Sequence, residues 1–188
     1  MSKKSEAMCE EVVQAFLEAL GQKEDELKGH NQRVAEFAVC LGQGMGLTGL
    51  ELIDLRWGAL LHDIGKLGIP DHILNKTGEL TKEEYEIIKT HTLLGSAILR
   101  HLSFLKRAYV VAESHHERWD GAGYPHGLKG TEIPLLARIS AVAGTYDALT
   151  SNRSYRLAWS KADALEYIRE KAGKAYDPQV VSVFLSII

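Results

Sequence analysis

The apolar residues of this chain recur at three- and four-residue spacing in almost every segment, and this periodicity constrains the fold more than any other feature. In LLARISAVAGTYDAL, residues 135–149, the apolar side chains fall on one stripe of a helix. No segment alternates apolar and polar residues convincingly, as a half-buried strand does, and no internal repeat is present. The sequence therefore predicts an all-α fold, a single-domain helical bundle.

Helix-start signals and two long irregular segments divide the chain. Thr48 with Glu51 and Thr81 with Glu84 are predicted capping boxes, and Ser160 is a predicted N-cap. The periodic segments predict helices at about 5–20, 25–45, 48–63, 81–101 with a break, 104–116, 135–150, from 160 onward, and after 177. The irregular segments are 64–80 and 117–132, and loops of such length in a compact domain are more often functional than idle.

Composition bounds the class of protein. A chain of 188 residues with a net charge of −3 fits one soluble domain and gives no sign of binding a nucleic-acid polymer or a membrane surface. Cys9 and Cys40 lie in helical patterns and are expected to be buried, reduced thiols. No signal peptide and no run of transmembrane length is visible, so we expect a cytoplasmic protein. Residues 1–24 are expected to form an N-terminal helix that acts as a linker or a dimerisation element, ahead of a domain over 25–188.

The eight histidines are placed in a way that suggests a metal site. His62 and Asp63 end one apolar helix, and His115 and His116 end another. Two further histidines, His30 and His91, lie within helical patterns, whereas His72, His101 and His126 are expected on the surface. Imidazoles and a carboxylate converging between helices hold transition metals in all-α scaffolds. An Asp shared by two metals also suits hydrolases that clamp a phosphate between metal ions.

Several motifs occur together and in order: HDIGK at 62–66, LGIPDHILNKTGELT after it, His91, HHERWDGAGYP at 115–125, IPLLARISAVA and SNRSYR. From about residue 30 to the C-terminus the chain resembles the HD-GYP family of bacterial cyclic-di-GMP phosphodiesterases. The resemblance implies a helical bundle of the HD-domain type with a glycine-rich GYP loop. It also implies hydrolysis of cyclic di-GMP to linear pGpG, and the resemblance leaves open whether pGpG or GMP is the end product. Contacts of the GYP loop with signalling proteins, and a homodimer, are further expectations.

The resemblance also implies a set of metal ligands. The expected cofactors are two or three divalent transition metals, iron or manganese, with Asp63 bridging two of them. Glu26 matches the position of a third-metal ligand in some members, although a solvated carboxylate in the run KEDE is at least as good an interpretation. The other positions that match ligands are His30, His62, Asp63, His91, His115 and His116.

Substrate-binding residues are implied in the same way. Lys66 matches the lysine that contacts the scissile phosphate, where a cation would offset charge developing on the phosphoryl oxygens; alone, it would be a lysine favouring a helix C-terminus. Tyr124 suits stacking on a base or hydrogen bonding to a phosphate. Arg153 and Arg156 match positions that hold phosphates or guanine, which the planar guanidinium group suits. Asp147 matches the second Asp of the sixth-helix motif and is assigned to the substrate site.

Gly144 is the one clear departure from the family pattern, in which A-x-x-D precedes two residues and D-A-L. Here the segment is AVAGTYDAL, so a glycine stands where the family has a metal-ligating Asp. An interior helix glycine costs about 1 kcal/mol relative to alanine. The site formed by His30, His62 and Asp63 is therefore expected to be weakened. Three accounts stay open: a weak or inactive natural form that binds cyclic di-GMP as a sensor or interaction module, an introduced substitution, or a site that works with fewer metals.

Overall fold

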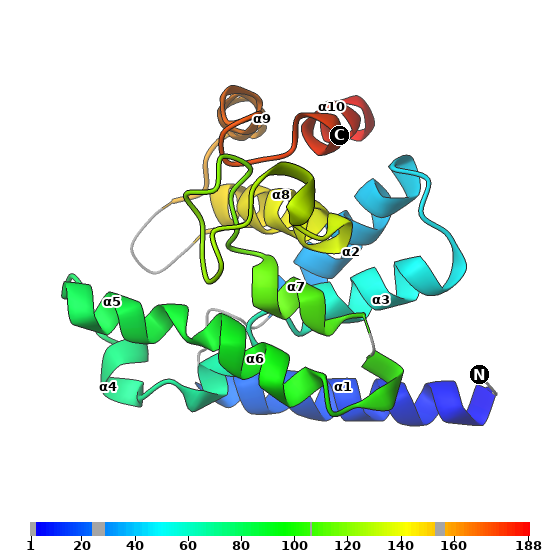
Figure 1. The fold of residues 1–188 in the computed structure, drawn as a ribbon, viewed down its shortest axis with the longest axis vertical. Coiled ribbons are helices and arrows are strands. Elements are labelled where there is room, and N and C mark those ends of the chain that lie inside the picture. The colour runs from blue at the N-terminus through cyan, green and yellow to red at the C-terminus, as the bar shows by residue number, and fades with distance from the viewer. Residues whose placement is uncertain (1–2, 24–28, 106, 153–156) are drawn as a thin grey trace.

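The computed structural model describes residues 3–23, 29–105, 107–152 and 157–188 (Figure 1). Its α-helices and short 3₁₀ helices (η) are α1 (Lys3–Lys23), α2 (His30–Gly44), α3 (Gly49–Leu60), η2 (Ile64–Gly68), α4 (Asp71–Leu74), α5 (Lys82–Lys89), α6 (His91–Leu99), η3 (Ser103–Leu105), α7 (Tyr109–Ser114), η4 (Gly130–Glu132), α8 (Leu135–Thr150), α9 (Lys161–Glu170) and α10 (Pro178–Ile187). These residues contain no strand, and the predicted all-α fold is confirmed.

Helix α8 is the centre of the bundle. It packs against α2, α7, α9 and α10, with α9 and α10 on one side of it and α1, α5 and α6 beyond its opposite side (Figure 1). Its predicted apolar stripe is buried, including Ile139, Val142 and Ala143. The polar edge of the same helix is buried as well, because Ser140 is 4% exposed and Asp147 is 1% exposed. Asp147 has hydrogen-bond partners on α2, whereas the hydroxyl of Ser140 has none among the described residues.

Most predicted helix boundaries hold to within a few residues, with instructive exceptions. The segment predicted over 81–101 breaks at Thr90 into α5 and α6. The capping box of Thr81 and Glu84 is confirmed, and Ser160 accepts a hydrogen bond from the backbone N–H of Asp163. The prediction was wrong at Thr48, which begins α3 without a side-chain cap. The irregular segment 64–80 contains η2 and α4, which are too short to leave a periodic signal.

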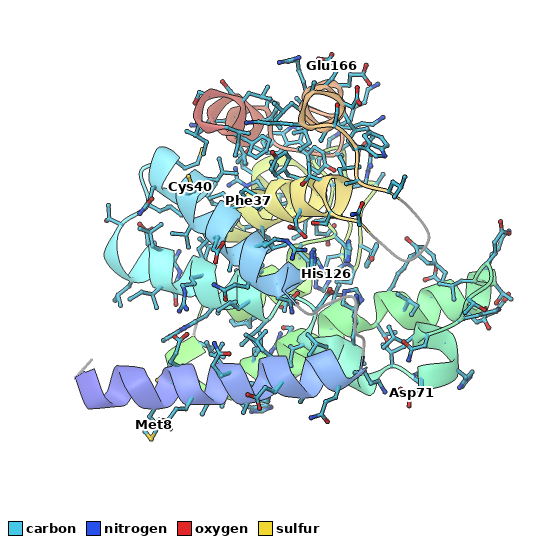
Figure 2. The ribbon with its side chains drawn as sticks, turned by 180° about the vertical axis from the view of Figure 1, so that it is seen from behind. Met8, Phe37, Cys40, Asp71, His126 and Glu166 are labelled. Atoms are coloured by element: carbon cyan, nitrogen blue, oxygen red, sulfur yellow. The ribbon has the colours of Figure 1, made fainter. Side chains whose placement is uncertain are left out.

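The N-terminal helix packs on the rest of the chain. Cys9 and Val13 of α1 belong to the main hydrophobic core, and Glu10 accepts two hydrogen bonds from the Arg56 guanidinium of α3, at 2.8 and 2.9 Å. The expected boundary near residue 24 falls outside the described residues. Cys9 is buried as predicted, but Cys40 is exposed on α2, so its predicted burial was wrong (Figure 2). Its place in the helical pattern did not reveal that it faces away from the core. Among the helices described, none is long and apolar enough to cross a membrane.

Candidate metal centre

Glycines allow three histidine-bearing segments to meet. A Cβ at Gly65 of η2 would lie 1.8 Å from the backbone oxygen of His91, so only glycine permits η2 to approach the start of α6 this closely. A Cβ at Gly58 of α3 would lie 2.6 Å from Val111 Cγ2 of α7. These contacts place η2 against α6 and α3 against α7, so the turn between α3 and η2, which carries His62 and Asp63, lies between them.

Asp63 lies at the centre of the histidines. Its Oδ2 is 3.4 Å from His62 Nε2, and its Oδ1 is 3.4 Å from His91 Nε2 and 3.8 Å from His115 Nε2. The Nζ of Lys66 lies 3.1 Å from Asp63 Oδ2. Asp63 and the three imidazoles are buried. His62, His91 and His115 therefore converge on the carboxylate of Asp63, although His91 and His115 lie far from it in sequence.

Backbone carbonyls fix which ring nitrogen of each buried histidine faces Asp63. The Nδ1 atoms of His62 and His91 each lie 2.7 Å from a carbonyl oxygen, of Ala59 and Ile88. His115 Nδ1 lies 3.0 Å from the carbonyl oxygen of Val111. A carbonyl oxygen only accepts, so we assign the proton of each neutral ring to Nδ1, which leaves Nε2 as a lone-pair donor to a metal.

The distance between two of these nitrogens shows that the residues fit a metal ion. His91 Nε2 and His115 Nε2 are 3.4 Å apart, so two hydrogen-bond acceptors face one another beside a carboxylate that only accepts. A cation between them satisfies all three groups. Imidazole nitrogens held by backbone carbonyls are the usual ligand arrangement of protein metal sites.

The electrostatics of the cluster favour metal binding. Burial lowers the pKa of His62 and, together with neighbouring rings, the pKa of His115, so both rings are neutral near pH 7. Burial alone would raise the pKa of Asp63, but Lys66 and the surrounding histidines hold that pKa well below its usual range. Neutral imidazoles around an ionised carboxylate form a donor set ready for a divalent cation.

His30 is oriented by a different partner. Its Nδ1 lies 2.6 Å from Asp147 Oδ2, and the guanidinium of Arg33 donates to both oxygens of the same carboxylate, at 2.5 and 3.0 Å. Arg33 also donates to Ser151 Oγ at 3.2 Å. Asp147 was assigned to the substrate site from sequence. The structure places its carboxylate against His30 and Arg33 of α2, and Asp147 does not line the pocket described below.

The ligand atoms fall into two sets that share Asp63. The four-donor set is Asp63, His91, His115 and His116, and the three-donor set is His30, His62 and Asp63; within each, the ligand atoms lie within 4.8 Å of one another. Glu26, the expected ligand of a third metal, lies outside the described residues.

Gly144 leaves space for a side chain. It is half-buried in α8, one helical turn before Ala148 and three residues before Asp147. A Cβ at this position would meet only Val34 Cγ1, at 4.0 Å, which is an ordinary van der Waals contact. No neighbour therefore requires a glycine here.

The GYP loop is held against the histidines by a buried carboxylate that sequence reasoning missed. Glu117 is 4% exposed, and its two oxygens accept from the backbone N–H groups of His126 and Leu128, at 2.7 and 3.0 Å. A Cβ at Gly123 would lie 2.3 Å from the backbone nitrogen of Arg118, so the loop folds tightly over this backbone. The ring of Tyr124 stacks on His116, with centroids 4.8 Å apart and an interplanar angle of 22°.

A pocket of about 410 Å³ opens beside the four-donor set. The phenol of Tyr176 donates to Thr145 Oγ1 at 2.8 Å on the α8 side of this pocket. Its other lining side chains include Tyr85, Lys89, His115, His116, Arg118 and Tyr124. Of these, sequence reasoning selected His115, His116 and Tyr124. The signal for the others was weak, although Lys89 lies two residues before His91 and Arg118 two residues after His116.

The remaining predicted residues are three surface histidines and two arginines. His72 and His101 are exposed, as predicted. His126 is also exposed, but its Nε2 lies 3.0 Å from Glu113 Oε1, which links the GYP loop to α7 (Figure 2 labels His126). Arg153 and Arg156 lie outside the described residues.

Comparison with known proteins identifies the family. The HD domain family matches residues 14–180. The chain belongs to the HD domain family. This HD domain is 42% identical over 178 residues to a cyclic di-GMP phosphodiesterase of Thermotoga maritima, across 93% of this chain and 48% of that protein. It is 38% identical over 174 residues to 3'3'-cGAMP-specific phosphodiesterase 3 of Vibrio cholerae, across 93% of this chain and 38% of that protein.

A solved structure agrees with the fold of this HD domain. It superposes on an HDG"Y"P protein from Bdellovibrio bacteriovorus with a TM-score of 0.66 and 22% identity, across 84% of this chain and 51% of that one. The resemblance to HD-GYP proteins is confirmed. The chain spans about half, or less, of the length of these relatives.

Proposed function

We propose that this HD domain is the catalytic part of a metal-dependent phosphodiesterase that hydrolyses cyclic di-GMP to linear pGpG, with GMP as a candidate end product. One observation carries the proposal: the Nε2 atoms of His62 and His91 converge on the shared Asp63 beside an open pocket. Backbone carbonyls hold the ring protons on Nδ1, so these Nε2 atoms can bind a metal. Relatives of 42% and 38% identity are named for hydrolysis of cyclic dinucleotides.

The metals would be held by the four-donor and three-donor sets, with Asp63 as the shared ligand. When bound, they supply an activated water and neutralise the non-bridging phosphate oxygens. Iron and manganese are the proposed metals because the resemblance to HD-GYP phosphodiesterases implies them; the imidazole and carboxylate donors accept both, as they also accept zinc or nickel.

The chain's own side chains would hold the substrate. Lys66, 3.1 Å from Asp63, places a positive charge where charge develops on the scissile phosphate. Burial raises the pKa of Tyr124, so its phenol stays protonated and can donate a hydrogen bond to a phosphate oxygen while its ring offers a stacking face. Glu117 fixes the loop that carries this ring.

Hydrolysis followed by chromatography tests the proposal. The protein is loaded with Fe²⁺ or Mn²⁺ under anaerobic conditions. It should then convert cyclic di-GMP to pGpG, and a chelator should stop the reaction. Cyclic GMP-AMP and cyclic di-AMP, assayed in parallel, define the base specificity. A loaded protein that leaves all three dinucleotides unchanged would overturn the proposal, whether or not it binds them.

Gly144 favours a second candidate, a cyclic-di-GMP-binding sensor that does not hydrolyse its ligand. The three-donor set contains one carboxylate, shared with the other set, and α8 supplies none at position 144. Stoichiometric binding without turnover, together with turnover after Gly144→Asp, would establish this candidate. Equal turnover by both forms would exclude it.

A further inference from the structure

Lys89 is a cation that lines the pocket and belongs to neither donor set of the metal centre. It is the last residue of α5, directly before the break at Thr90 that precedes His91. Its side chain is 27% exposed and lines the same pocket as His115 and His116. The residue therefore brings a positive charge to the part of the pocket wall that α5 forms.

Two aromatic rings flank this ammonium. Lys89 Nζ lies 4.9 Å from the ring centroid of Tyr85 and 5.5 Å from that of Tyr124, distances at which a cation is attracted to a ring face. The ammonium forms an ion pair with Glu86, whose Oε1 accepts a hydrogen bond from it at 2.6 Å. The Glu86 side chain is 68% exposed and does not line the pocket. An ammonium has three donors, so further donors remain for a ligand.

The other charges of the pocket wall are more fully engaged. Arg118 donates two hydrogen bonds to Asp120, at 3.1 and 2.7 Å. Both oxygens of Glu117 are taken by loop amides. Lys89 pairs with one carboxylate, that of Glu86, which lies outside the pocket, so its remaining ammonium protons can serve a ligand inside the pocket. A cyclic dinucleotide carries two phosphates, and only one of them can be the phosphate under attack at the metals.

We propose that Lys89 binds the second phosphate of the cyclic dinucleotide, the one not being cleaved, while Tyr85 and Tyr124 hold its ammonium in place. The proposal rests on the proposed function, because it takes a two-phosphate ligand as given. It assigns Lys89 a role in discriminating cyclic dinucleotides from ligands that carry a single phosphodiester.

Calorimetric binding of two probes to the manganese-loaded protein tests this role. The probes are cyclic di-GMP, with two phosphates, and the linear dinucleoside monophosphate GpG, with one. Lys89→Met keeps most of the apolar stem and removes the charge. Lys82→Met, at the exposed start of the same helix, makes the same change of charge outside the pocket. Metal content is measured on every sample to show that the metal centre is intact.

Lys89→Met should weaken binding of cyclic di-GMP by about 10- to 100-fold, the range for a hydrogen bond to a charged group, and change GpG binding by less than about twofold. Lys82→Met should change neither. Equal weakening of both probes, or of neither, would overturn the assignment to the second phosphate. A wild-type protein that binds and hydrolyses no cyclic dinucleotide would instead overturn the proposed function, and this proposal with it.

Discussion

The two donor sets of the metal centre share Asp63 and are otherwise built differently. The four-donor set adds three histidines from the ends of α6 and α7, at which glycines and backbone carbonyls fix the geometry. The three-donor set adds His62 and His30, and His30 depends on a carboxylate 117 positions along the chain. His62, His91 and His115 are oriented by carbonyl oxygens three or four residues away, whereas His30 is oriented by a long-range side-chain contact. The two sets therefore differ mainly at His30.

Charge also separates the two sets. The Asp147 carboxylate that orients His30 is shared with the Arg33 guanidinium, so part of its negative charge is neutralised. Position 144, where the family pattern places a carboxylate, adds none. We therefore expect the four-donor set to bind its metal more tightly than the three-donor set.

The largest effect should come from the residue common to both sets. Asp63→Ala should lower metal affinity at both sites by more than about 100-fold, because changes to groups that only orient ligands already cost about 10–100-fold. Plasma mass spectrometry of the purified variant measures the loss, and far-UV circular dichroism reports on the fold. Asp71→Ala, at an exposed position of α4 that belongs to neither donor set, is the matched control (Figure 2 labels Asp71). Retention of one full equivalent of metal by Asp63→Ala would show that the two sets do not share this ligand.

A smaller and one-sided effect is expected at Asp147. Asp147→Asn keeps the shape of the side chain but weakens its hold on His30 Nδ1. Affinity should fall about 10- to 100-fold in the three-donor set and stay unchanged in the four-donor set. Titration with Co²⁺, whose absorption reports on coordination, separates the two sets. A loss of affinity in both sets, or in neither, would remove the role assigned to Asp147.

The smallest effect concerns the glycine itself. Gly144→Ala should raise the free energy of unfolding by about 0.5–1 kcal/mol, because the added Cβ meets only Val34 Cγ1 at 4.0 Å and alanine favours the helix. Urea unfolding of the metal-free protein measures it. A decrease in stability would mean that α8 needs a glycine at this point for packing.

Local patterns carried most of what the sequence could predict. The periodicity of α8 and the cap at Thr81 are encoded by neighbours in sequence. The pairs His62–Asp63 and His115–His116, each at the end of an apolar helix, predicted the candidate metal centre. The contact of Asp147 with His30 joins residues 117 positions apart, which spacing cannot reveal. Likewise, the exposure of Cys40 depends on which neighbours cover α2, and the role of Glu117 depends on where the loop amides turn.

The most direct measurement is a calorimetric titration of Mn²⁺ into metal-free wild type and Gly144→Asp protein, with Gly144→Ala as the control for the change in helix backbone. We expect one tight site and one site weaker by about tenfold or more in the wild type. In Gly144→Asp the second site should tighten by about tenfold or more, whereas Gly144→Ala should match the wild type. Two equally tight sites in the wild type, or an aspartate that changes nothing, would contradict the claim that the two donor sets are unequal because α8 lacks a carboxylate.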